Sequence, residues 1–147
     1  MWLDIVIFSP MIVLLFWGNS QFQHFQLYYL LPGLLVGLTY SVYLVKRFGG
    51  TPGKLLMGIV ITRVDGSKVG YKEAFLRELP GYFLSTLGSL AVGLATLKIS
   101  EAEYFSLSFS ERSLRLAELK PSWHTPLQWM YNIWIWSEFI VLLTNER

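Results

Sequence analysis

The sequence predicts an all-α integral membrane protein with about four transmembrane helices. Hydrophobic residues make up 53% of the chain and charged residues only 15%, whereas soluble domains are typically ~25% charged. Residues 1–45 contain a single acidic residue, Asp4, and no Lys or Arg. Four apolar runs approach the ~20 residues that cross a bilayer. These predicted spans, in one domain of residues 1–147, are residues 3–17, 27–45, 79–99 and 127–144.

The ends of the predicted spans carry residues typical of the membrane–water interface. Trp2 and Trp17 flank the first span, and Tyr28 and Tyr29 begin the second. Such rings favour the headgroup region. Pro80 stands near the start of the third span, where proline fits the first turn of a helix.

The charge distribution predicts how the spans are oriented. Residues 18–26 contain no Lys or Arg, and three basic residues in 100–126 are offset by four Glu. Basic loops stay on the cytoplasmic side, so residues 46–78 form a cytoplasmic connection and 100–126 an extracytoplasmic one. We therefore expect a multi-pass protein of the cell membrane with both termini in the cytoplasm. Seven of the twelve Lys and Arg lie in the second connection: Lys46, Arg47, Lys54, Arg63, Lys68, Lys72 and Arg77.

The cytoplasmic connection contains its own structural signals. Thr51 is a good N-cap and Pro52 a good first residue for a short helix at the interface. Residues 59–64 are rich in β-formers, and Asp65 with Gly66 follows as a hairpin turn signal. We therefore predict a small β-hairpin in this connection.

Residues 71–79 predict an amphipathic helix on the membrane surface that leads into the third span. Tyr71 and Phe75 fall on one side of such a helix, whereas Lys72 and Glu73 fall on the other. This pattern is typical of interfacial helices.

The third connection is compatible with two structures. Its apolar segments could form a hairpin about residues 110–113. Alternatively, Ser110 could cap a helix that runs to Lys120, with Glu111 and Arg115 as an i,i+4 pair.

The segment 47–54 does not fit a phosphate-binding loop. Phe48 stands where the P-loop pattern requires Gly, and Leu55 follows Lys54 where a hydroxyl should hold magnesium. We instead expect Lys46, Arg47 and Lys54 to contact anionic lipid headgroups. No His has a second ligand at metal spacing, so we expect no metal site. We also expect no cofactor, no nucleic-acid partner and no enzymatic activity.

Small residues recur every four positions in two of the spans. Lipid provides no hydrophobic drive for helix association, so such residues allow close packing. We predict contact faces, either against each other or against a partner such as a second copy of the chain. The two stripes are Gly33, Gly37 and Ser41, and Gly81, Ser85, Ser89 and Gly93.

Polar residues within the spans are the candidate functional groups, because a charge inside lipid is costly. Asp4 begins the first span, and Asn132 and Glu138 lie in the fourth. One interpretation is a cation or proton site that Glu138 forms with Asp4 or Asn132. The other is that Glu138 is an interfacial carboxylate bonded to a neighbour.

The cytoplasmic connection resembles the RDD family of small membrane proteins. The resemblance is carried by Gly50-Thr51-Pro52-Gly53-Lys54, Gly58-Ile59-Val60-Ile61, Val64-Asp65-Gly66 and Ala74-Phe75-Leu76-Arg77-Glu78. It implies a multi-spanning helical protein of bacteria or archaea with a poorly defined function, for which transport of ions or small solutes is usually proposed. Asp4 matches the first Asp of the family's namesake residues, whereas the upstream Arg and the second Asp have no counterpart here. We therefore expect either a fragment or a divergent member.

Two functions follow as expectations from this resemblance and from the residues. The first is transport of a cation, coupled to protons, or of a small solute. The alternative is a non-transporting scaffold or accessory subunit that acts through helix–helix contacts. A continuous polar path through the spans would favour the first.

Overall fold

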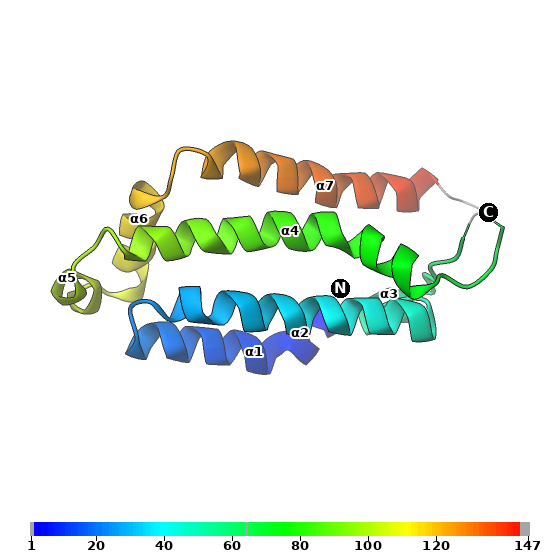
Figure 1. Ribbon diagram of the computed structural model, residues 1–147, viewed down its shortest axis with the longest axis horizontal. Helices are drawn as coiled ribbons and strands as arrows, with labels where there is room; N and C mark the ends of the chain where they lie inside the picture. The colour runs from blue at the N-terminus through cyan, green and yellow to red at the C-terminus, as the bar shows by residue number, and fades with distance from the viewer. Residues whose placement is uncertain (1, 64, 145–147) are drawn as a thin grey trace.

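The computed structural model describes residues 2–63 and 65–144, with the side chains of residues 6–63, 65–137 and 140. These residues are predominantly helical, which confirms the helical character of the predicted fold (Figure 1). The described helices are α1 Trp2–Gln21, α2 Phe25–Phe48, α3 Pro52–Leu56, α4 Tyr71–Thr96, α5 Glu101–Ser106, α6 Phe109–Leu119 and α7 His124–Thr144.

The four long helices lie side by side, with α4 in the middle (Figure 1). Helix α4 has its most extensive contact with α2 and a second contact with α7, while α1 packs on α2. The loop 57–70 lies at one end of the bundle, and α5 and α6 lie at the other (Figure 1). We call these the loop end and the helical end.

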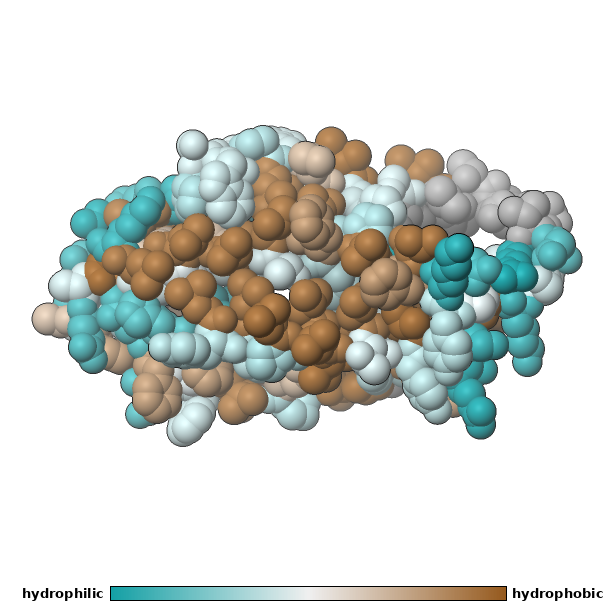
Figure 2. Space-filling model, in the orientation of Figure 1, coloured by the Kyte–Doolittle hydropathy of each residue, from teal (hydrophilic) through white to brown (hydrophobic). Residues whose placement is uncertain are grey.

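The surface of the bundle is apolar over its middle. Figure 2 shows a hydrophobic band between two hydrophilic ends on the face it displays. Large apolar side chains on all four long helices are exposed, among them Val13, Leu35, Phe83 and Trp129. Such an extended apolar surface marks a membrane or protein interface. A helical bundle with this surface fits a bilayer, because the backbone groups along a helix are hydrogen-bonded within the helix and need no water.

Two helical segments among the described residues are long and apolar enough to cross a membrane. They are Phe25–Leu56, which comprises α2 and α3, and Tyr71–Thr96, which is α4. The segment Val6–Gln21 of α1 is apolar but shorter. The prediction of four spans therefore stays a prediction for α1 and α7.

The β-hairpin predicted for the cytoplasmic connection is reduced to a turn. Thr62 and Lys68 form an isolated antiparallel bridge, and no β-strand occurs among residues 2–63 and 65–144. The Ile61 N–H donates to the Gly49 carbonyl oxygen at 2.6 Å, so it bonds to the end of α2 rather than to a partner strand. Tertiary contacts thus replace the ladder that the β-rich sequence favoured.

The amphipathic helix predicted at residues 71–79 is not a separate element. Helix α4 runs without interruption from Tyr71 to Thr96, with Pro80 inside it. Proline lacks the N–H that would bond to Leu76, but the flanking turns pack against α2 and α7. Packing therefore carries the helix through the proline and brings its first two turns onto the bundle.

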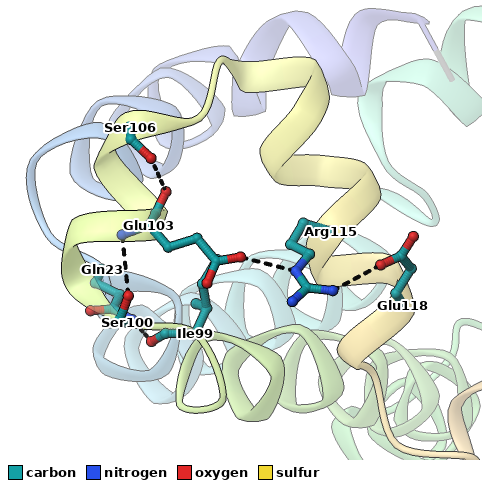
Figure 3. Close-up of polar contacts among 7 residues, drawn as sticks. All are labelled: Gln23, Ile99, Ser100, Glu103, Ser106, Arg115 and Glu118. Carbon is teal, nitrogen blue, oxygen red and sulfur yellow. Dashed lines mark hydrogen bonds and ion pairs between the residues drawn. The ribbon is translucent and has the colours of Figure 1, made fainter.

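The third connection adopts helices rather than a hairpin. Helix α6 begins after Ser108, two residues before the predicted cap, and a further helix, α5, precedes it. Ser108 and Glu111 form a reciprocal capping box, so Glu111 is not paired with Arg115 as predicted. Arg115 instead lies between Glu103 and Glu118, at 3.0 and 3.1 Å (Figure 3).

Each end of the bundle has its own buried apolar cluster. The loop-end cluster joins α2, the loop and α4, and the helical-end cluster joins α4, α5 and α6. The first cluster thus fixes α2 to α4, and the second fixes α5 and α6 to α4. The loop-end cluster contains Val45, Ile61, Val69 and Ala74, and the helical-end cluster contains Ala95, Ile99, Tyr104 and Leu116.

Candidate functional site

Three cavities lie along α4, and all three are lined by Ser85. The loop-end cavity measures about 410 Å³, the middle cavity about 310 Å³ and the α7 cavity about 260 Å³. Each of the three is also lined by residues of at least one other long helix. Ser85, which is itself exposed, is therefore the residue that the walls of all three cavities share.

The loop-end cavity contains the only acid–base pair among the residues that line the three cavities. The Arg77 Nε lies 4.0 Å from the Glu78 Oε1, and the Glu78 side chain is 15% exposed. Both side chains come from the part of α4 that precedes Pro80. Thr51, the N-cap residue of α3, lines the same cavity. Two segments that are far apart in the sequence therefore supply its polar wall.

A hydroxyl network closes the side of this cavity toward α2. The Tyr82 hydroxyl donates to the Gly37 carbonyl oxygen at 2.8 Å and lies 2.7 Å from the Ser41 Oγ. A phenol has one proton to donate, so the Ser41 hydroxyl donates to the Tyr82 oxygen. Buried hydroxyls are costly when they lack partners, and this network satisfies both while it joins α2 to α4.

The middle and α7 cavities extend from Ser85 toward the helical end. Gln26 of α2 and Ser89 of α4 line both cavities. His124 and Gln128 of α7 line the α7 cavity. The walls thus combine apolar surface with a few hydroxyl, amide and imidazole groups, which is typical of ligand-binding cavities.

The predicted polar residues of the first and fourth spans are not brought together in the described part of the chain. Asn132 is exposed on α7 and accepts a hydrogen bond from the Gln128 Nε2 at 3.4 Å. The side chains of Asp4 and Glu138 lie outside those that the structure describes. A site that Glu138 forms with Asp4 or Asn132 stays a prediction.

The predicted small-residue stripes face several different neighbours. A Cβ on Gly37 would lie 2.8 Å from the Tyr82 ring, and one on Gly93 would overlap the Leu27 side chain, so both positions hold α2 close to α4. Gly81 instead faces Trp134 of α7. The remaining positions differ: Gly33 faces Tyr29 of its own helix, Ser41 bonds to Tyr82, and Ser85 and Ser89 line cavities.

Most residues of the resemblance motif have structural roles. Gly50 and Gly53 are buried beside the loop, and Pro52 occupies the first position of α3, as predicted. Asp65 accepts hydrogen bonds from the backbone N–H and the hydroxyl of Ser67, which close the turn. Gly66 has a φ of 79° in that turn, and Lys54 lies in α3. Thr51, Arg77 and Glu78 are the motif residues that line the loop-end cavity.

Sequence reasoning missed Glu78, Tyr82, Gln26 and Tyr131 as cavity residues. Glu78, Tyr82, Ser85 and Ser89 follow one another at spacings of four, three and four residues, which place them on one face of a helix. This stripe could have been found if the helix had been continued through Pro80. Gln26 and Tyr131 carry no comparable signal.

Clusters of metal ligands are absent from the part of the chain that the structure describes. No group of three or more His, Asp or Glu side chains there could hold a metal ion.

The comparisons with known proteins agree with the resemblance. The model of the RDD family matches residues 1–146. Comparison with curated proteins and with solved structures gives no match. The match covers almost the whole chain, and the apolar helices and exposed apolar surface fit it. The chain therefore belongs to the RDD family and is a membrane protein.

Proposed function

We propose that this RDD protein moves a cation, coupled to protons, or a small polar solute along α4. The observation that carries the proposal is the set of cavities that meet at Ser85. A solute could pass between the loop end and the helical end through a bundle that is otherwise apolar. Burial of polar groups inside a membrane protein is costly and generally marks a functional pathway.

The Glu78 carboxylate is the group best suited to interact with a cation or a proton. It belongs to the cavity wall and is mostly buried. Hydroxyls of Ser41, Tyr82 and Ser85 line the same cavity, and oxygen atoms of this kind replace part of a cation's water shell. The nearby Arg77 limits how strongly the cavity holds a cation, because like charges repel. A weaker hold is useful, because a transported cation must be released as well as bound.

Cysteine accessibility provides a direct test, because the chain contains no cysteine. Ser85→Cys should react with a charged, membrane-impermeant thiol reagent if water reaches the cavities. Thr39→Cys is the matched control, since Thr39 is also exposed but lines none of the three cavities. An unreactive Ser85→Cys in a folded protein would contradict a water-filled path.

Flux measurements in proteoliposomes test the role of the carboxylate. Glu78→Gln should abolish pH-dependent cation flux. Glu73→Gln is the control, because Glu73 lies on the same helix but pairs with Arg63 at the surface. Equal flux in both variants and in the parent protein would remove Glu78 from the mechanism.

The alternative function is a scaffold or accessory subunit that acts through helix–helix contacts. An exposed stripe on α7 favours it: Trp129, Ile133 and Trp136 are each more than half exposed and share one face. Crosslinking from Ile133→Cys in native membranes would detect a partner or a second copy. A scaffold would retain this crosslink and show no flux under any ionic gradient.

A further inference from the structure

A fourth cavity of about 240 Å³ lies at the helical end, between α1, α4 and α6. We call it the α6 cavity. Its wall includes the apolar side chains of Phe16, Phe109 and Leu116, and the polar groups of Asn19, Thr96 and Arg112. It shares Gln26 with the middle and α7 cavities but not Ser85. The cavity is thus amphipathic and contains one permanent positive charge.

Arg112 is held in place by neutral groups. Its Nη1 donates to the Asn19 carbonyl oxygen at 3.4 Å and its Nη2 to the Leu107 carbonyl oxygen at 3.2 Å. The guanidinium carbon lies 4.3 Å from the centre of the Tyr104 ring. The Tyr104 hydroxyl also donates to Asn19, at 2.9 Å. These contacts orient the guanidinium, but they use only two of its five N–H donors.

The charge of Arg112 has no carboxylate partner among the described residues. Arg115, one turn further along α6, contrasts with it, because Arg115 contacts both Glu103 and Glu118 (Figure 3). The carboxylate of Glu111, which precedes Arg112 in the sequence, accepts hydrogen bonds from the Ser108 backbone N–H and hydroxyl. A half-buried guanidinium that faces an apolar cavity favours an anion as its counter-charge.

The mouth of the α6 cavity carries exposed aromatic rings. Phe16 is 54% exposed and Phe109 is 67% exposed, and their ring centres lie 5.7 Å apart. Helix α6 lies where the apolar band of the surface gives way to the hydrophilic end (Figures 1 and 2). In a bilayer, such a boundary between apolar and polar surface corresponds to the region where lipid headgroups meet acyl chains. An anion that reaches Arg112 from this side would have its apolar portion against the two rings.

We propose that the α6 cavity binds the phosphate of an anionic phospholipid in the leaflet at the helical end, with Phe16 and Phe109 packed against the first acyl carbons. A phosphate diester matches the planar donors of a guanidinium. The cavity volume accommodates a headgroup rather than a whole lipid. The site lies apart from Glu78 and the loop-end cavity, so the lipid-binding proposal does not depend on the transport proposal.

Lipid binding to the purified full-length protein tests this site. Native mass spectrometry and thermal unfolding in detergent would be measured with phosphatidylglycerol, phosphatidylcholine, decyl phosphate and inorganic phosphate as separate probes. We expect phosphatidylglycerol to bind and to raise the unfolding temperature, and phosphatidylcholine to do neither. Arg112→Gln should weaken phosphatidylglycerol binding by about tenfold or more, because a charged hydrogen-bonded contact is lost.

Matched variants separate the site from general charge effects. Arg115→Gln removes the same charge from the same helix and should leave lipid binding unchanged. Ser113→Phe should fill the cavity and weaken binding with Arg112 still present, which keeps the test valid if Arg112→Gln does not fold. Arg112→Lys keeps the charge but loses the planar fork, and we expect intermediate affinity.

Several outcomes would overturn the proposal. Equal affinity for phosphatidylglycerol and phosphatidylcholine would show that the headgroup charge is not recognised. Undiminished phosphatidylglycerol binding to folded Arg112→Gln or Ser113→Phe would place the lipid elsewhere. If decyl phosphate or inorganic phosphate binds and phosphatidylglycerol does not, the ligand is a soluble anion instead of a lipid.

Discussion

The two ends of the bundle are stabilised by different means. At the loop end, residues 49–63 and 65–70 are held mainly by backbone geometry and backbone hydrogen bonds, such as that from Ile61 to Gly49, with the Asp65 side chain closing one turn. At the helical end, side chains have the larger part: Ser100 and Ser108 cap α5 and α6, and Gln23 bonds to two carbonyl groups at and just after the end of α4. One end thus depends mainly on what the backbone can adopt, and the other mainly on which side chains are present.

This difference accounts for where each end carries polar chemistry. The backbone-held loop end leaves the side chains of Thr51, Arg77 and Glu78 in the wall of a cavity. The helical end uses many of its polar side chains in caps and ion pairs, and Arg112 is the arginine left without a carboxylate there among the described residues. Substitutions at the two ends should therefore act through different mechanisms.

The largest effect on stability is expected from Tyr104→Ala at the helical end. The Tyr104 side chain is 2% exposed, and its loss removes an aromatic core residue at a cost of about 3–5 kcal/mol in the free energy of unfolding. Unfolding in detergent micelles would measure it. Tyr71→Ala, at an exposed position of the loop end, should cost about 1 kcal/mol or less. Equal losses would contradict the view that Tyr104 belongs to a packed cluster.

Gln23→Leu should cause the next largest loss of stability, because it leaves two buried carbonyl oxygens without a hydrogen-bond donor. The Gln23 Nε2 donates to the carbonyl oxygens of Thr96 and Ile99 at 2.8 and 2.7 Å, in a buried position. Figure 3 shows the bond to Ile99. Each unsatisfied buried group costs about 1–3 kcal/mol. Gln21→Leu, at a nearby exposed position, is the control. Unchanged stability of Gln23→Leu would mean that water replaces the amide.

Alanine substitutions of loop-end glycines test the dependence on backbone geometry. Gly49 has a φ of 83° and Gly58 a φ of 72°, and a side chain in this region costs about 1–2 kcal/mol. Gly49→Ala should cost more than Gly58→Ala, since its Cβ would lie 2.6 Å from the Val60 Cγ1, whereas the Cβ at Gly58 meets nothing within 4 Å. Thermal unfolding would rank them.

The control for this comparison is Gly88→Ala within α4. Its Cβ would also meet nothing within 4 Å, and alanine favours a helix by about 1 kcal/mol over glycine. A stabilised Gly88→Ala beside two destabilised loop variants would confirm that backbone conformation, rather than space, limits the loop end.

The smallest expected effect is a loss of local order in acid at both ends. Hydrogen bonds from the hydroxyl and then the backbone N–H of Ser108 lower the pKa of Glu111 below its ordinary value of 4.5. Bonds from the Ser67 hydroxyl and then its N–H lower the pKa of Asp65 in the same way. A lowered pKa in the folded state stabilises it above the ordinary pKa, and this contribution is lost as the pH falls through the lowered value.

Amide hydrogen exchange at several pH values would measure this effect. Protection of the first turn of α6 should decrease below about pH 4.5, and protection of the turn at Asp65 below about pH 3.8. Glu111→Gln should remove the pH dependence only at the helical end, and Asp65→Asn only at the loop end. A pH dependence that persists in both variants would assign it to other groups.

The order and type of the long helices could be predicted because apolar runs of sufficient length have few alternatives. Helix α4 begins at Tyr71, eight residues before the predicted start of the third span, because the charged residues before Pro80 were assigned to a separate surface helix. That separation hid Glu78 from the candidate site. The hairpin prediction failed because local β-propensity was outweighed by the contacts of Ile61 and Val69 with α2 and α4.

By itself, the sequence determined the helical class, the membrane character and the family, because each depends on composition and on local order along the chain. Only the tertiary structure decided that Glu78, Tyr82 and Ser85 meet in cavities, and that Arg112 faces one without a carboxylate partner among the described residues. The physical reason lies in the solvent. Lipid is as apolar as the helix surface, so hydropathy does not specify which face of a helix turns inward. Close packing, hydroxyl networks and the caps at the two ends determine that choice.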